Sequence, residues 1–135
     1  MRKSFDTHAQ EYDTWYDQHS KAFDSELAAI KKVLEHVHPE HRSIEIGVGT
    51  GRFAQALHIS HGADPSVEML ELARDRIIIC TQAVAENLPF KNKSFDLVLM
   101  ITVDCFLTDL QQTFAEVFRI LEPEGRLVLG IHDSG

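Results

Sequence analysis

The sequence predicts an α/β protein, a three-layer α/β/α sandwich around a mostly parallel sheet. Strand-like and helical segments alternate along most of the chain, the order that produces a parallel sheet covered by helices on both faces. Several strand-like segments are apolar on both faces, as buried parallel strands are. After the first of them comes Gly47-x-Gly49-x-Gly51, a glycine-rich turn of the kind that brings backbone close to a ligand.

Two helices are expected before the first strand. Over residues 4–16, aromatic residues predict an amphipathic helix with an aromatic face. Over residues 20–36, apolar residues recur at steps of three and four, and Pro39 ends the pattern. Three histidines around this proline are interpreted as exposed loop residues rather than metal ligands: His36, His38 and His41.

The sheet and its helices are expected over the rest of the chain. A strand over 43–46 leads into the glycine turn and a helix through Phe53 and Leu57. A strand over 58–63 is followed by Ser66, a typical N-cap, and a helix over 67–74. The remaining expected elements are a buried strand over 77–80, a loop over 85–90, a buried strand over 95–101, a helix over 109–121 with Phe114, Val117, Phe118 and Leu121 on one face, a turn over 123–125 and a last strand over 126–131.

Composition excludes several classes of protein. A length of 135 residues fits one domain, and no apolar run approaches the roughly 18 residues that span a membrane. No secretory signal is recognisable, so we expect a cytoplasmic protein. The net charge of -8 argues against nucleic acid as a partner and favours a small-molecule substrate. Cys80 and Cys105 are too far apart for a redox or zinc motif, and no metal is expected.

The glycine turn favours a nucleotide-like ligand with a positive group. Glu45 lies two residues before the first glycine, where a strand delivers a side chain to a ligand. A dinucleotide fingerprint would need a third glycine at the position of Arg52, because that glycine allows close packing of helix and strand. Arg52 therefore disfavours a dinucleotide.

The pattern Glu45-x-Gly47-x-Gly49-x-Gly51 resembles motif I of the class I S-adenosylmethionine (SAM)-dependent methyltransferases, in particular the small-molecule, UbiE-like kind. Segments 62–70, 85–98 and 119–127 are similar to later motifs of the same family, in the right order. Together they cover about residues 40–130. The resemblance implies a Rossmann-like fold and SAM as the cofactor.

The resemblance also implies which residues hold the methionine and ribose parts of SAM. Glu45 would lie near its ammonium group, and the backbone of Gly47, Gly49 and Gly51 would approach its methionine portion. Asp64, followed by Pro65, would accept hydrogen bonds from the ribose hydroxyls.

Other residues would contact the adenine or cover the cofactor. Met69 would pack on the adenine ring, and Ala85 would offer its amide to the adenine edge with Glu86 beside it. Tyr12 and Tyr16 resemble the N-terminal lid of the family. Rings in that position could also favour a sulfonium by cation–π attraction.

We therefore expect a SAM-dependent methyltransferase whose acceptor is an unidentified small molecule. Two alternatives are a SAM-binding module that does not catalyse and, less favoured, a dinucleotide-binding protein. Methyl transfer mainly requires that donor and acceptor be held in line. Where a base is needed, the candidates are Tyr12, Tyr16, Asp104 and His132, and the sequence assigns none of them.

The expected domain organisation is a single unit over residues 1–135, with N-terminal lid helices over 1–38 and an α/β core over 42–132. Members of the family usually continue past the fifth strand with further helices and an antiparallel strand pair, which this sequence lacks. The strand over 126–131 would then be an apolar edge, which natural proteins normally cover. Either the sequence is a fragment, or this edge pairs with another chain, or a rearranged terminus covers it, and of these we expect pairing with a second copy in a homo-oligomer.

Overall fold

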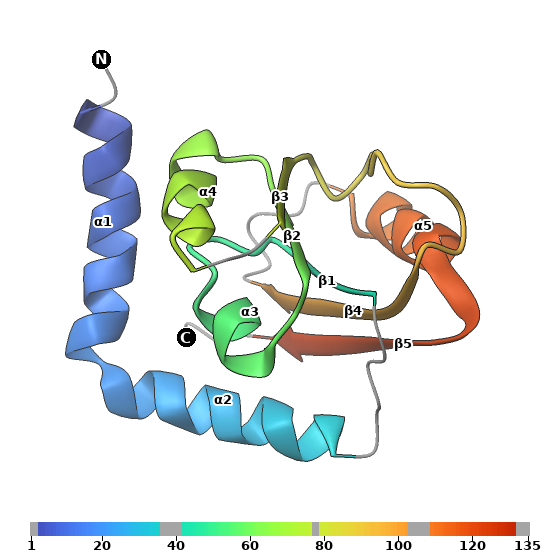
Figure 1. Cartoon of the computed structure of the whole chain (residues 1–135), viewed down its shortest axis with the longest axis horizontal. Helices are drawn as coiled ribbons and strands as arrows, with labels where there is room; N and C mark the ends of the chain where they lie inside the picture. The colour runs from blue at the N-terminus through green and yellow to red at the C-terminus, as the bar shows by residue number, and fades with distance from the viewer. Residues whose placement is uncertain (1–2, 36–41, 77–78, 103–108, 132–135) are drawn as a thin grey trace.

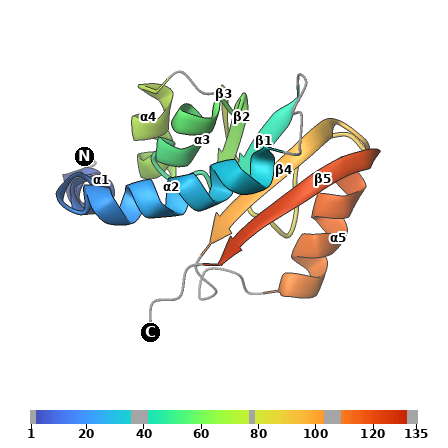
Figure 2. The ribbon, with the colours of Figure 1, turned by 90° about the horizontal axis from the view of Figure 1, so that it is seen from below.

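The computed structural model describes residues 3–35, 42–76, 79–102 and 109–131, which form an α/β/α sandwich (Figures 1 and 2). The elements are α1 (Lys3–Gln18), α2 (Ser20–Leu34), β1 (Ser43–Ile46), α3 (Arg52–Leu57), β2 (His61–Asp64), α4 (Val67–Arg74), β3 (Ile79–Gln82), β4 (Phe95–Thr102), α5 (Leu110–Ile120) and β5 (Leu121–Ile131). None of the described helices is long and apolar enough to cross a membrane.

All five strands are parallel and lie in the order β3-β2-β1-β4-β5. The chain adds β2 and β3 on one side of β1, then crosses to the other side for β4 and β5. Ligands of such sheets bind beyond the carboxyl ends of the strands, where the strand order reverses. That point lies between β1 and β4, and the glycine turn follows β1 there.

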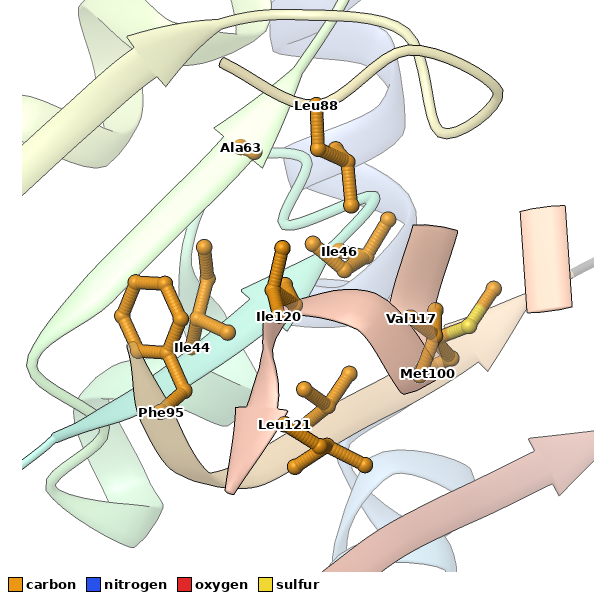
Figure 3. Close-up of a cluster of buried hydrophobic side chains, with 10 residues drawn as sticks. Ile44, Ile46, Ala63, Leu88, Phe95, Met100, Val117, Ile120 and Leu121 are labelled. Carbon is orange, nitrogen blue, oxygen red and sulfur yellow. The ribbon is translucent and has the colours of Figure 1, made fainter. Parts of the chain in front are cut away.

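The sheet has a buried cluster of side chains on each face. Alternate residues of β1, Ile44 and Ile46, face α5 and pack with Val117 and Ile120 (Figure 3). The opposite face carries Leu97 and Leu99 of β4, packed against α2, α3 and α4. Because side chains alternate along a strand, Glu45 lies on this second face, toward α3. Figure 2 shows α5 on one side of the sheet and α2 with α3 on the other. The predicted fold class is confirmed.

Three predicted strands have other bounds in the structure, and the last of them begins at Leu121 rather than at 126. The second strand starts at His61 rather than 58, because His58 takes a left-handed conformation (φ 59°) that ends α3. The third strand runs over Ile79–Gln82, and Ile79 is 61% exposed instead of buried. Its apolar residues suggested a strand buried on both faces, but β3 is at the edge of the described sheet. Residues 77 and 78 of the predicted strand lie outside the described residues.

The predicted apolar face of the last helix is confirmed at Val117 and Leu121 and wrong at Phe118. The buried residues of α5 are Thr113, Val117 and Ile120, while Phe118 is 63% exposed. Asp109 caps this helix by accepting a hydrogen bond from the Gln112 amide at 3.0 Å. The predicted turn over 123–125 lies within the range of β5, next to an irregularity in its pairing with β4. The other predicted helices and strands agree with the structure to within about two residues.

Candidate functional site

The glycine turn has a backbone that only glycine adopts easily. Gly47, Gly49 and Gly51 have φ values of +77°, +58° and +86°, in the left-handed region that side chains disfavour. The amides of Gly47 and Val48 donate to the Ala63 carbonyl at 2.7 and 3.0 Å, which fixes the turn to β2. A Cβ placed on Gly47 would meet no heavy atom within 4 Å. The backbone at Gly47 therefore borders open space.

Asp64, the last residue of β2, is fixed by two backbone amides. Its Oδ2 accepts from Gly49 at 2.9 Å, and its Oδ1 accepts from Ser66 at 2.9 Å. Ser66 caps α4 as predicted, by accepting from the Met69 amide at 3.2 Å. Burial raises the pKa of Asp64, although these two amide bonds oppose the shift. The exposed Pro65 follows, and its carbonyl accepts from the Gln82 side chain.

Glu45 is a buried carboxyl group with an unsatisfied oxygen. Its side chain is 2% exposed, and Oε1 has no hydrogen-bond partner. Burial raises its pKa well above the ordinary value, the negative charge of Asp64 adds to this, and a hydrogen bond from the Ala54 amide opposes it. A buried polar atom without a partner destabilises a fold. The arrangement thus favours a ligand that brings a positive charge or a hydrogen-bond donor.

Tyr12 of α1 lies against the glycine turn. Its hydroxyl oxygen is 3.6 Å from the position that a Cβ on Gly49 would take. Tyr12 is 40% exposed, and its partial burial raises its pKa, as do the charges of Tyr16, Glu45 and Asp64. Burial also raises the pKa of Tyr16. Both hydroxyls therefore stay protonated at neutral pH and are poor general bases without a change in their surroundings.

Tyr16 has a structural environment. Its ring packs edge-on against Phe23 and Phe53, with centroid distances of 5.7 and 6.1 Å, in the cluster between α1, α2 and α3. Its centroid lies 5.3 Å from that of Tyr12. Tyr16 therefore attaches α1 to the core and packs against the ring of Tyr12.

The adenine-side residues lie on neighbouring elements. Met69 is half-buried in the first turn of α4. Ala85 packs against the cluster on the α5 face, and the Glu86 carbonyl accepts from the Gln112 side chain at 3.1 Å. Because the sheet is parallel, the loop after β3 leaves the same edge as the glycine turn.

The structure thus brings together Tyr12, Glu45, the glycine turn and Asp64, and it places Ala85 and Glu86 on a separate loop at the same edge. Other predicted positions lie outside the described residues: Asp104, His132, His36, His38 and His41.

Sequence reasoning missed an ionic cluster beside the turn. Asp13 of α1 accepts hydrogen bonds from the side chains of Thr50, Arg52 and Arg76. Arg52 had been interpreted only as the residue that breaks a dinucleotide pattern. The partners are 37 to 63 positions away from Asp13, so no local spacing could indicate them.

Comparisons with known proteins give one family. The family described as methyltransferase domain matches residues 44–129. An uncharacterised protein of Methanocaldococcus jannaschii is 41% identical over 129 residues, which cover 96% of this chain and 61% of that protein.

Solved structures agree. A protein of Thermotoga maritima, described as a SAM-dependent methyltransferase and possible histamine N-methyltransferase, is 43% identical with a TM-score of 0.83, over 96% of this chain and 60% of that one. A SAM-dependent methyltransferase structure from Methanococcus maripaludis, 24% identical with a TM-score of 0.81 over 93% and 63% of the two chains, shares the fold. The chain spans about three fifths of the length of these relatives.

Proposed function

Since this chain belongs to the methyltransferase domain family, of class I fold, we propose that it binds SAM at the glycine turn and transfers the methyl group to a small molecule. The predicted resemblance is confirmed. SAM as the cofactor is supported because similar solved structures are SAM-dependent methyltransferases. The acceptor and the activity itself are the proposal.

The observation that carries the proposal is the unpartnered Oε1 of Glu45. SAM carries an ammonium group and a sulfonium, and a buried carboxylate next to Asp64 suits a cationic ligand. The open space at Gly47 would admit the methionine portion of SAM, since any Cβ there would project into it. These residues therefore fit the cofactor.

The remaining roles follow from position. Asp64 keeps lone pairs for the ribose hydroxyls even with both amide bonds in place, since each carboxylate oxygen accepts more than one hydrogen bond. Met69, Ala85 and Glu86 would form the adenine side of the site, and Pro65 would line it. Tyr12 would cover the turn, with Tyr16 holding it there.

When bound, SAM would supply an electrophilic methyl group for an in-line displacement. The chain's own task is then to bind, align and exclude water, which lowers a barrier by up to roughly 7–11 kcal/mol when alignment is close. Tyr12 stays protonated, so it can donate a hydrogen bond to an acceptor rather than deprotonate it. An acceptor that is already a free amine would need no base.

The first acceptors to test are small amines, because the Thermotoga maritima relative is described as a possible histamine N-methyltransferase. Purified protein is incubated with methyl-labelled SAM and either histamine, other small amines, or phenols and carboxylic acids. Label in an organic product supports the proposal. SAM binding without transfer to any acceptor would instead favour the binding module without catalysis, and absence of SAM binding would overturn the proposal altogether.

Four further expectations stay predictions. A single domain with a lid over residues 1–38 and a core over 42–132 is one, and a cytoplasmic location is another. Independence from nucleic acid is the third. Self-association through β5, an edge strand of the described sheet, is the fourth, and sedimentation of the purified chain tests it.

A further inference from the structure

Helix α1 is joined to the glycine turn through one carboxylate. The Asp13 side chain accepts from Thr50 Oγ1 in the glycine turn at 2.7 Å and from Arg52 Nε at the start of α3 at 2.6 Å. It also accepts from Arg76, just after α4, at 3.0 Å. Three elements that are distant in sequence thus meet at Asp13, and Figure 1 shows α1 running alongside α4.

The two arginines make a second set of bonds that closes the cluster. Arg52 also donates to the backbone carbonyl of Asp13 at 2.9 Å and to Asp17 at 2.6 Å. Arg76 donates to the backbone carbonyl of Thr50, inside the turn, at 2.9 Å. Arg52 therefore links α1 to α3, and Arg76 links α1 to the glycine turn. The planar guanidinium group of each arginine fixes the directions of these bonds.

The cluster is shielded and well satisfied. The Asp13 side chain is 18% exposed, whereas that of Asp17 is 66% exposed. Burial alone would raise the pKa of Asp13, but the hydrogen bonds from Thr50, Arg52 and Arg76 outweigh it and hold the pKa below its ordinary value. Exposed ion pairs contribute little to stability, while a shielded carboxylate with several donors contributes more.

Little else in the described part of α1 attaches it to the core. Over its residues 9–18, Ala9 alone is buried, and Tyr16 is half-buried against Phe23 and Phe53. A helix with so small an apolar contact depends on polar contacts for its place and rotation. The Asp13 cluster is the largest set of these among the described residues.

Asp13 directly follows Tyr12, whose hydroxyl lies at the Gly49 backbone. We propose that Asp13 is a positioning residue that holds α1 against the glycine turn, so that Tyr12 covers the bound cofactor. The inference rests on the proposed function, because it takes the glycine turn to be the SAM site. In this proposal, Arg52 and Arg76 donate the hydrogen bonds that hold the helix in place.

The chain offers both a probe and a matched control. Its only tryptophan, Trp15, lies on α1, is 40% exposed, and contacts Tyr16 with a centroid distance of 5.0 Å. Its fluorescence therefore reports how α1 is docked. Asp17→Asn removes the same charge from the same helix one turn later, at an exposed position that accepts one bond from Arg52.

The experiment compares wild type, Asp13→Asn and Asp17→Asn. Calorimetry gives the SAM affinity, stopped-flow displacement gives the dissociation rate, and acrylamide gives the access of solvent to Trp15. We expect Asp13→Asn to weaken SAM by about tenfold or more, mainly through faster dissociation, and to raise Trp15 quenching in the cofactor-free protein. Asp17→Asn should stay within about twofold of wild type, since exposed charge contacts are weak.

The outcomes separate the two proposals. If wild type does not bind SAM, the proposed function fails. If wild type binds SAM and Asp13→Asn matches it in affinity, dissociation rate and Trp15 quenching, the role of Asp13 is overturned. Should Asp13→Asn fail to fold, Arg52→Gln takes its place, because it removes the same contact from the other side, and an unchanged dissociation rate would again overturn the inference.

Discussion

At the scale of single residues, the ionised Glu45 carboxylate destabilises the unliganded fold and would be stabilised by a cationic ligand. Its folded-state pKa is raised, so between the ordinary carboxyl value and the raised one the native state binds more protons than the unfolded state. Stability must therefore fall as pH rises through that window. Glu45→Gln removes this dependence, and we expect the variant to equal wild type near pH 4 and to exceed it at pH 8 in urea unfolding.

The same substitution should weaken SAM. Loss of a hydrogen bond to a charged group typically corresponds to about 1.5–3 kcal/mol, or roughly a tenfold to hundredfold rise in Kd. In calorimetry between pH 5 and 7, wild type should release a proton on binding SAM and the variant should not. Glu124→Gln, at an exposed position of β5, is the control. Equal affinity in both variants would contradict the assignment of Glu45.

Gly47 tests the open space at the turn. Gly47→Ala places a methyl group where no atom of the chain lies within 4 Å, so the fold should lose only the strain of a left-handed alanine, about 1 kcal/mol. SAM affinity should fall by about tenfold or more if its methionine portion occupies that space. Gly130→Ala on β5 is the control, because a Cβ there makes ordinary contacts. Gly49 is less suitable, since a Cβ there would contact Tyr12 rather than open space.

Local sequence patterns were sufficient to predict that Glu45 and the glycine turn lie close to Asp64. Glu45, the glycines and Asp64 lie within twenty positions of one another, and strand, turn and strand bring them together without information from elsewhere. Asp13 is different. Nothing in residues 3–18 indicates which arginines it meets, because that depends on how α1 packs across α3 and α4.

At the scale of elements, α5 holds the loop after β3 in place. Arg119 donates to the carbonyls of Leu88 at 2.8 Å and Phe90 at 2.7 Å, and Glu116 accepts from the Leu88 amide at 2.7 Å. Arg119→Met should lower the free energy of unfolding by about 1–2 kcal/mol and speed hydrogen exchange in residues 86–92.

The adenine side of the proposed site should loosen with that loop. We expect the Kd for SAM to rise by about threefold to tenfold in Arg119→Met, measured by calorimetry. Arg126→Met removes an exposed arginine from β5 and should change neither quantity. Faster exchange with an unchanged Kd would show that the loop does not contact the cofactor.

The sequence was sufficient to predict which segments are helices and which are strands, but not which of their faces are exposed. Apolar periodicity identified α5 and its buried Val117, yet it also placed Phe118 on the core face, and the structure leaves Phe118 exposed and buries Thr113. Ile79 was likewise predicted to be buried and is exposed on β3. Periodicity indicates that a face is apolar, but burial depends on which neighbour lies there, and that neighbour is fixed by sheet order.

At the scale of the whole molecule, cofactor binding should stabilise the chain. A ligand at one hundred times its Kd adds about 2.7 kcal/mol to the free energy of unfolding. We expect SAM and its demethylated product to raise the melting temperature by several degrees, and NADH to leave it unchanged. The reverse result would favour a dinucleotide site and contradict the comparisons with known methyltransferases.

The parallel arrangement of the strands explains why the residues of the proposed site gather at one edge of the sheet. The glycine turn, Asp64 and the loop with Ala85 all lie at the carboxyl end of the parallel strands. Helix α1, near the N-terminus of the chain, reaches the same edge of the sheet. Fold class follows from alternating strands and helices. The position of α1 follows from contacts between charged groups that only the folded chain brings together.

Arg52 has a consequence for attempts to redesign this protein. In a dinucleotide fold its position is glycine, which lets a helix approach a strand, whereas here its side chain reaches across to α1. Changing Arg52 to glycine would complete the fingerprint and at the same time remove the bonds from Arg52 to Asp13 and Asp17 of α1. We therefore expect a switch of cofactor preference in this scaffold to require a redesigned N-terminal helix in addition to that single step.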